Sequence, residues 1–177
     1  MPATEEAVLI ERLRAREDDA YEEIYREYRH RIYKMAYNLR HDPFFADDVC
    51  QETMFRIYNG ISSMKGDAAL STWIYRIAYN TALELHRKNK RHIHEMLDTE
   101  KIDFADKDQA VGKYDELDRV LSKLKEKERN ILVLFYIDDF SIAELARIIG
   151  VSEANAKVLL FRARKKAGEV ACELQRV

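Results

Sequence analysis

The stretch Ser141–Lys157, SIAELARIIGVSEANAK, decides the fold of the C-terminal part of the chain. It predicts two helices, over 142–149 and 153–174, joined by a turn at Gly150. A serine precedes each helix as an N-cap, and glycine permits the left-handed backbone that such a turn needs. The apolar residues have the spacing of a small core between two crossing helices: Ala146, Ile149, Val151, Ala156 and Leu160. The pattern is that of a helix-turn-helix.

The second helix of this motif carries a surface charge of one sign. No acidic residue stands between Ala154 and Gly168, where the basic residues are Lys157, Arg162, Arg164, Lys165 and Lys166. Contact with phosphates needs such a surface, and the second helix of a helix-turn-helix enters the major groove. The plainer alternative is a helical hairpin with a solvated charged face. Caps, turn, core spacing and charge together favour DNA binding.

The composition of the whole chain favours a helical protein. Its 177 residues are 47% hydrophobic and include only 5 Gly and 2 Pro, about 4% of the chain against about 12% on average. Sheets joined by tight turns need more of both, so we predict an all-α fold. The sequence contains no apolar run of membrane-spanning length, no signal peptide and no CxxC pair. These features favour a reduced, cytoplasmic protein.

Apolar residues at three- and four-residue steps predict four helices in the N-terminal half. They span about 4–16, 18–40, 43–58 and 70–90. Asp18 or Asp19 can cap the second helix, whereas Asp42 and Pro43 occupy the N-cap and first position of the third. The expected core residues are Ile24, Tyr28, Ile32, Met35, Ala36 and Leu39, then Ala46, Val49, Cys50, Thr53 and Ile57, then Leu70, Ile74, Ile77, Ala78, Thr81 and Leu85.

The net charge of −2 is distributed unevenly and indicates the domain organisation. Residues 1–94 balance at zero, residues 95–118 carry −6 and residues 119–177 carry +4. Helical periodicity is lost over 95–112 and returns with helices over about 114–124 and 126–136. We therefore predict a helical domain over 1–94, a partly disordered acidic linker over 95–112 and a basic helical domain over 113–177.

Aromatic and polar side chains alternate between Ile61 and Arg91. The aromatic residues are Trp73, Tyr75 and Tyr79, and the polar ones are Arg76, Asn80, Arg87 and Lys88. Aromatic faces stack on unpaired bases while cations hold the backbone, which is how single strands are bound. Aromatic residues at helical spacing are more often part of the core, so this signal is weak by itself.

Metal and catalytic signatures are poor. Glu27-x-x-His30 lacks the second such pair and the further carboxylates of a di-iron bundle. His92-x-His94 stands alone beside the acidic linker, and no phosphate-binding Gly-rich loop, HExxH or GxSxG is present. We therefore predict no catalytic residue, no metal site and no cofactor.

Three stretches, in this order, resemble the bacterial extracytoplasmic-function (ECF) sigma factors, group 4 of the main sigma family. Ala46–Phe55, ADDVCQETMF, is similar to the family pattern A-x-D-h-x-Q-E-[TAV]-F. Lys65–Asn80, KGDAALSTWIYRIAYN, is similar to a family loop followed by T-W-L-Y-R-I-A-x-N. The third stretch is the helix-turn-helix that ends in FRAR at Phe161–Arg164. The resemblance covers about residues 8–170 and strengthens the single-strand interpretation of Trp73.

The resemblance implies a non-enzymatic specificity subunit of RNA polymerase, with region two in the N-terminal domain and region four in the C-terminal one. Region two would bind the clamp helices of the largest polymerase subunit through Asp48, Gln51, Glu52 and Phe55. It would open the minus-ten element and hold its non-template strand with Met64, Lys65, Gly66, Asp67, Ala68, Trp73, Arg76, Asn80 and Arg87. Region four would bind the flap of the second-largest subunit and read the minus-thirty-five element with Ser152, Glu153, Asn155, Lys157, Val158, Phe161, Arg162 and Lys165. An anti-sigma factor would be the usual regulator.

The reading helix departs from the family pattern after Lys157, where Val158-Leu159 replaces the usual Ser-Arg. These apolar residues could contact thymine methyl groups or serve an anti-sigma partner. Two rival interpretations stay open. A stand-alone helix-turn-helix regulator with an N-terminal helical sensor domain would bind duplex DNA without polymerase. A metal-dependent enzyme would hold iron or zinc through Glu27, His30 or His92.

Overall fold

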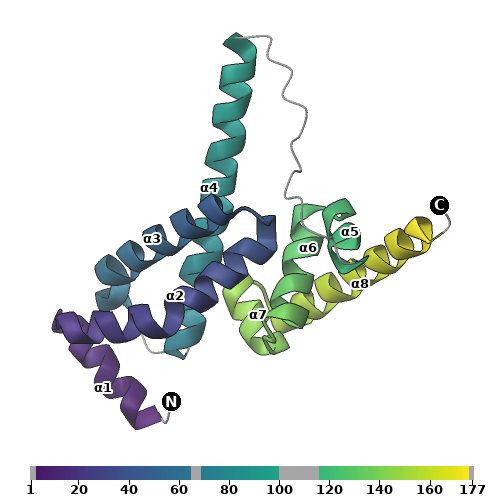
Figure 1. Ribbon diagram of the computed structural model, residues 1–177. Coiled ribbons are helices and arrows are strands. Elements are labelled where there is room, and N and C mark those ends of the chain that lie inside the picture. Colours follow the sequence, from purple (N-terminus) through teal and green to yellow (C-terminus); the bar gives the residue numbers. More distant parts are fainter. Residues whose placement is uncertain (1–2, 65–68, 100–115, 176–177) are drawn as a thin grey trace. The chain divides into compact units, whose positions relative to one another are not determined.

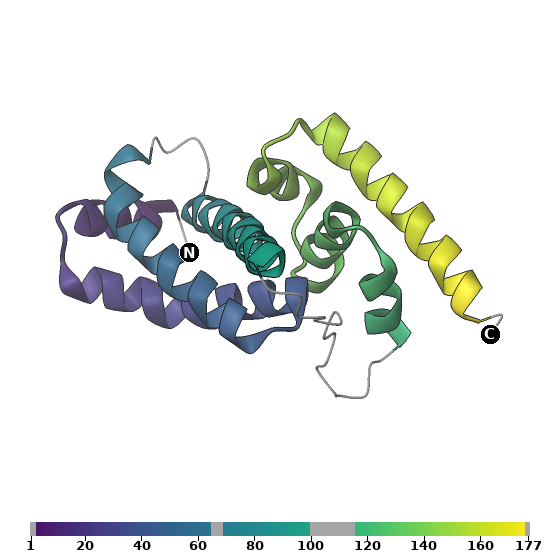
Figure 2. The ribbon, with the colours of Figure 1, turned by 90° about the horizontal axis from the view of Figure 1, so that it is seen from above.

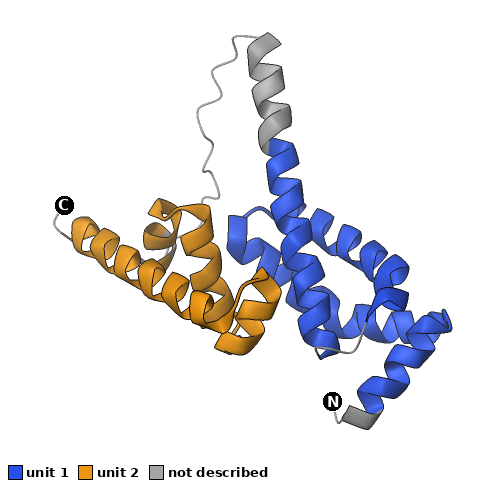
Figure 3. Ribbon diagram, turned by 180° about the vertical axis from the view of Figure 1, so that it is seen from behind, with its two compact units in different colours: residues 1–105 blue, residues 106–177 orange. Residues whose placement is uncertain are grey.

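The computed structural model describes residues 3–64, 69–99 and 116–175, and all regular elements in these ranges are helices. The chain divides into two compact units, residues 1–105 and 106–177 (Figure 3). The first contains α1 (Ala3–Arg14), α2 (Asp18–Arg40), α3 (Pro43–Gly60), the 3-10 turn η1 (Ile61–Ser63) and α4 (Leu70–Thr99) (Figure 1). The second contains α5 (Glu116–Lys123), α6 (Glu126–Leu132), the π-helical segment η2 (Val133–Ile137), α7 (Ile142–Ile149) and α8 (Glu153–Leu174). The all-α prediction is confirmed, and none of the described helices is long and apolar enough to cross a membrane.

The core of the first unit forms where α2, α3 and α4 pack against one another (Figure 2). The predicted core residues of α2 and α3 are all buried, and Ala20 and Phe45 join them. On α4 the prediction holds for Leu70, Ile74, Ala78 and Thr81, whereas Ile77 and Leu85 are only half-buried. Helical periodicity therefore identified the buried faces almost completely.

The helices of the first unit begin and end where the sequence predicts, with two exceptions. Asp42 caps α3 by accepting hydrogen bonds from the backbone N–H groups of Phe44 and Phe45 at 3.0 and 3.1 Å, as predicted. The N-cap of α2 is Glu17, so Asp18 and Asp19 lie in the first turn, where negative charge complements the helix dipole.

The second exception is the end of α4, which lies at Thr99 and not near residue 90. Basic residues at 86–92 are favourable near a helix C-terminus, but no Gly or Pro follows until Gly112, so nothing breaks the helix there. Residues 95–99 of the expected linker are therefore helical, and its residues 100–112 lie outside the described ranges.

The helix-turn-helix of the second unit forms as predicted. Ser141 and Glu144 form a capping box, and the Ser152 hydroxyl accepts a hydrogen bond from the Asn155 N–H at 3.2 Å. Gly150 ends α7 in the left-handed conformation, with φ 75° and ψ 39°. The side chains of Ala146, Ala156 and Leu160 are buried between the helices, and those of Ile149 and Val151 are half-buried.

The helix expected over 126–136 changes character midway. After Leu132 the chain continues as the π-helical segment η2, and the N–H of Asp138 donates to the carbonyl of Val133 at 3.0 Å. A π turn accommodates one more residue than an α turn. The rings of Phe135 and Tyr136 in this segment both lie against the Arg164 guanidinium of α8, with centroids 5.3 and 5.2 Å from its carbon.

Candidate nucleic-acid and polymerase interfaces

The outer face of α3 carries the residues expected to bind core polymerase. Asp48, Gln51 and Phe55 are exposed, the last by 64%. Their spacing places them on one stripe of the helix, and Phe44, four residues before Asp48, extends it. Phe44 is 82% exposed and was missed from the sequence. Phe44 does not belong to the periodic series of buried residues on α3, and this could have identified it as an exposed aromatic residue.

Glu52 is less exposed to solvent than Asp48, Gln51 and Phe55. The Arg56 guanidinium donates to Glu52 at 2.8 Å and to Glu84 of α4 at 2.7 Å, so it joins α3 to α4. The hydrogen bond from Arg56 lowers the pKa of Glu84, and the two carboxylates raise the pKa of Arg56. Glu52 is half-buried in this arrangement.

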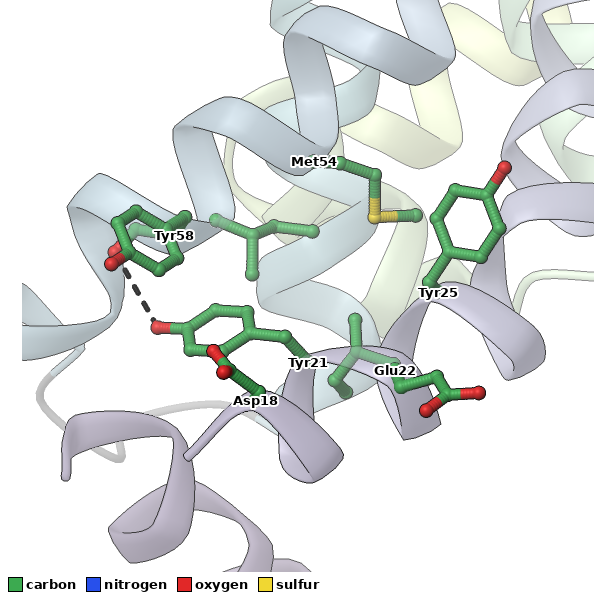
Figure 4. A pocket seen from close by; sticks show the side chains of 8 residues that line it. Asp18, Tyr21, Glu22, Tyr25, Met54 and Tyr58 are labelled. Atoms are coloured by element: carbon green, nitrogen blue, oxygen red, sulfur yellow. Dashed lines mark hydrogen bonds between the residues drawn. The ribbon is translucent and has the colours of Figure 1, made fainter. Parts of the chain in front are cut away.

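A groove of about 350 Å³ lies beside the α3 stripe, between α2 and α3 (Figure 4). Met54 and Tyr25 face each other across it, and the carboxylates of Asp18 and Glu22 lie at its rim. The Tyr21 hydroxyl donates to the Leu13 carbonyl at 3.0 Å, which fixes one wall. An apolar groove with an acidic rim suits an apolar partner surface bordered by cations.

Of the residues expected to hold single-stranded DNA, some are exposed on α4 and others lie outside the described residues. Arg76, Asn80 and Arg87 are exposed at spacings that place them along one face of α4. Lys65, Gly66, Asp67 and Ala68 lie outside the described residues.

The aromatic residues of α4 are buried in the core of the first unit, and their expected contact with unpaired bases stays a prediction. Trp73, Tyr75 and Tyr79 are only 7–8% exposed, and Met64 is 4% exposed. The Trp73 ring lies against Gly60, where a β-carbon would be 3.6 Å from it. Packing against α2 and α3 therefore determines these positions, and the polar residues alone are presented outward.

Helix α1 contacts Met64 and Leu70, two described residues that are far from it in the sequence. Arg14 donates to the carbonyl of Met64 at 2.7 Å, and the N–H of Leu70 donates to the Glu6 carboxylate at 2.8 Å. The partners are 50 and 64 residues apart in the chain. No local sequence pattern predicts such contacts.

The outward face of α8 presents all eight residues expected to read duplex DNA. Ser152, Glu153, Asn155, Lys157, Val158, Phe161, Arg162 and Lys165 are exposed. Val158 is 45% exposed while Leu159 is half-buried, so Val158 is the more outward of the apolar pair. Two other cations are engaged: Lys166 pairs with Glu169 at 3.2 Å, and Arg164 lies against the aromatic pair of η2.

Groups that could support redox or metal chemistry are few. Among the residues that the structure describes, no group of three His, Cys, Asp or Glu side chains could hold a metal ion. Cys50 is buried, donates its S–H to the Arg29 carbonyl at 3.5 Å, and has its pKa raised by burial to about 11. Cys172 is exposed on α8.

Two family models match the chain in the order that the interfaces suggest. The Sigma-70 region 2 model matches residues 24–92, and the Sigma-70 region 4 model matches residues 114–166. The region 2 match covers the half that the rival interpretations assigned to a sensor domain or a metal enzyme. It favours the sigma interpretation over both.

Solved structures share the fold. CnrH, in complex with the cytosolic domain of CnrY, has a TM-score of 0.69 at 19% identity, over 93% of this chain and 96% of CnrH. The sigma factor RpoE of Bartonella quintana, in complex with the anti-sigma factor NepR, has a TM-score of 0.66 at 22% identity, over 85% and 95%.

Curated relatives are similar over most of their length. The ECF RNA polymerase sigma factor SigW of Bacillus subtilis (strain 168) is 30% identical over 171 residues, which cover 88% of this chain and 91% of SigW. SigM of the same organism, also an ECF RNA polymerase sigma factor, is 30% identical over 149 residues, which cover 82% and 91%. Together with the matches to both sigma regions, this similarity shows that the chain belongs to the extracytoplasmic-function sigma factors.

Proposed function

We propose that this protein binds core RNA polymerase, recognises and melts specific promoters, and so directs transcription initiation without catalysing a reaction itself. The observation that carries the proposal is the outward face of α8. Its capped N-terminus and its exposed side chains, which include Lys157, Arg162 and Lys165, form a surface suited to a major groove. This face would read the minus-thirty-five element.

The first unit would supply the other two contacts. The exposed stripe Phe44, Asp48, Gln51 and Phe55 of α3 would bind the clamp helices of polymerase, since exposed aromatic residues typically anchor protein interfaces. The exposed Arg76, Asn80 and Arg87 of α4 would hold the non-template strand of the minus-ten element, and residues 65–68 would capture a base of that strand. Extruding a base costs a few kcal/mol, which these contacts would offset.

Regulation by an anti-sigma factor is part of the proposal, and the protein would act in the cytoplasm. RpoE of Bartonella quintana, which shares the fold, was solved with its anti-sigma factor. In this chain the groove between α2 and α3 borders the α3 stripe. A regulator seated in the groove would cover the polymerase-binding face. The domains would be region two over 1–94 and region four over 113–177, joined by residues 95–112.

The test is co-elution with bacterial core RNA polymerase, followed by run-off transcription on a pool of genomic promoters. Stable co-elution and new start sites are expected, and the aligned transcripts would give both promoter elements. A folded, inhibitor-free protein that neither co-elutes nor directs new starts would refute the proposal.

Two arginines of α8 provide a matched comparison. Arg162→Ala removes an outward cation, whereas Arg164→Ala removes one held by Phe135 and Tyr136. We expect Arg162→Ala to weaken promoter binding and reduce its dependence on log salt concentration by roughly one phosphate contact, a slope change of about 0.9. Arg164→Ala should leave this slope unchanged.

A further inference from the structure

Arg164 lies at the edge of the outward face of α8. It directly follows buried Ala163 and stands four residues after buried Leu160, so it borders the face that packs against the rest of the second unit. Its guanidinium carbon lies 5.3 and 5.2 Å from the ring centroids of Phe135 and Tyr136 on η2. Stacking on aromatic faces is a favoured arrangement for a guanidinium group. Arg164 therefore links α8 to η2 although its side chain is exposed.

The π-helical form of η2 suits this contact. Phe135 and Tyr136 are consecutive residues, whose side chains would point about 100° apart on an α-helix. A π turn contains more residues, so the angle between consecutive side chains is smaller. The two ring centroids are 5.0 Å apart with an interplanar angle of 81°, an edge-to-face pair. The rings thus form one aromatic surface, and Arg164 lies against both of them.

The end of η2 is tied closely to the start of α7. The N–H of Asp138 donates to the carbonyl of Val133 at 3.0 Å. The N–H of Phe140 donates to the carbonyl of Leu134 at 3.1 Å, and the capping box of α7 begins at the next residue, Ser141. A shift of η2 relative to α8 would therefore move the first turn of α7 as well.

The angle between α7 and α8 is thereby fixed at two points. At the turn between the helices, the Val151 N–H donates to the Ala146 carbonyl at 2.9 Å. Near the other end of α7, the contact of Arg164 with η2 provides the second point. In a helix-turn-helix the first helix crosses the DNA backbone while the second lies in the major groove. The angle between them therefore determines whether both helices can contact DNA together.

We propose that Arg164 is a positioning residue of the minus-thirty-five site. It holds η2, and with it α7, at the angle to α8 at which both helices fit the DNA. It does so by stacking on Phe135 and Tyr136 and not by contacting a phosphate. This inference rests on the proposed function, which assigns duplex reading to α8. It extends the site to two aromatic residues that carry no charge and lie outside the reading helix.

The experiment uses holoenzyme assembled from core RNA polymerase and the full chain. Two duplexes are compared: a promoter found by run-off transcription, and the same promoter with its minus-thirty-five element scrambled. Affinity for core is measured first, and affinity for each duplex is then measured over a range of salt concentrations. Amide hydrogen exchange in α8 reports whether the second unit of each variant is folded.

The variants remove the two sides of the contact separately. They are Arg164→Ala, Arg164→Lys, Tyr136→Leu and the double variant with Arg164→Ala and Tyr136→Leu. Tyr136 is 58% exposed, so its replacement by leucine does not open a cavity in the core. Lys166→Ala is the matched control, because it removes a nearby exposed cation that pairs with Glu169 at 3.2 Å.

We expect Arg164→Ala and Tyr136→Leu each to weaken binding of the intact promoter up to about fivefold, the size of a partly exposed cation–π contact. The double variant should lose no more than about twofold beyond either single variant, because both changes remove the same contact. The dependence on log salt concentration should stay unchanged, since no phosphate contact is lost. Binding of core and of the scrambled promoter should stay within about twofold of wild type. Arg164→Lys keeps a cation without the planar group and should bind with intermediate affinity.

Other results would contradict the proposal in different ways. A fall of about 0.9 in the salt slope of Arg164→Ala, with Tyr136→Leu equal to wild type, would show a phosphate contact and overturn the positioning role. Promoter binding of both variants equal to that of Lys166→Ala would overturn it too, as would equal losses on the intact and scrambled promoters. If Arg164→Ala loses amide protection throughout α8, Tyr136→Leu and Arg164→Lys decide between these outcomes. A wild-type holoenzyme that binds core but does not distinguish the two promoters would instead refute the minus-thirty-five function of α8.

Discussion

The turn of the helix-turn-helix gives the sharpest stability prediction, because two glycines of the second unit separate backbone strain from steric contact. Gly150 has φ 75°, and a β-carbon added there would meet no atom within 4 Å. Gly168, inside α8, also has open space around its missing β-carbon but ordinary helical geometry. The same Gly→Ala change should therefore have opposite effects at the two positions.

The magnitudes follow from conformational preference alone. A left-handed alanine costs about 1–2 kcal/mol, partly offset by about 0.4–1 kcal/mol from the stiffer unfolded chain. We expect Gly150→Ala to destabilise the second unit by about 1 kcal/mol, and Gly168→Ala to stabilise it by about 0.5–1 kcal/mol.

Amide hydrogen exchange in α7 and α8 of the full chain would measure the difference. The expected destabilisation corresponds to roughly fivefold faster exchange in Gly150→Ala, including the Val151 N–H that donates to the Ala146 carbonyl at 2.9 Å. Trp73 is the sole tryptophan and lies in the first unit, so its fluorescence unfolding curve should be the same in both variants. Slower exchange in Gly150→Ala than in wild type would refute the argument from the left-handed turn.

Three further predictions concern other groups. Since Arg56 lowers the pKa of Glu84 below its ordinary 4.5, Glu84 stabilises the first unit above that pH, and this contribution is lost as pH falls through the lower folded value. Arg56→Met should therefore weaken the acid dependence of fluorescence-detected unfolding, and an unchanged acid limb would contradict the coupling. Because burial raises the pKa of Cys50 to about 11, iodoacetamide at mildly alkaline pH should modify only exposed Cys172 in the folded protein. Peptide mass mapping checks this, and labelling of Cys50 without unfolding would oppose it. If Val158 contacts a thymine methyl, replacing that thymine by uracil should weaken holoenzyme binding to the duplex about fourfold, whereas Val158→Ser should show no such loss. Equal sensitivity of the two proteins would rule the contact out.

Features that depend on neighbours in sequence could be predicted. The Asp42 cap followed by Pro43 started α3, and Gly150 between two capped helices defined the helix-turn-helix. Burial along α2 and α3 followed from periodicity, because a helix with one apolar stripe has one way to face a core.

Features that depend on residues distant in the sequence could not be predicted. Trp73 stands in a mixed aromatic and polar run, and only its packing against Gly60 shows that it belongs to the core. The predicted end of α4 near residue 90 is wrong, because the helix continues to Thr99. Positive charge is favourable near a helix C-terminus, but it does not end a helix when no Gly or Pro follows. The contacts of Glu6 and Arg14 join residues more than a helix length apart in sequence, and neither side chain has a local signature.

The long-range contacts of α1 also imply an order of events during synthesis. Helix α1 leaves the ribosome first, yet Leu70, which completes its contacts, is made 64 residues after Glu6. At roughly 5–20 residues per second, this delay lasts about 3–13 s. Helices α2 and α3 form a local pair that can close within that interval, because their loop is short and its closure costs little entropy. The first helix to be translated therefore completes its contacts only after α2 and α3 have both been made.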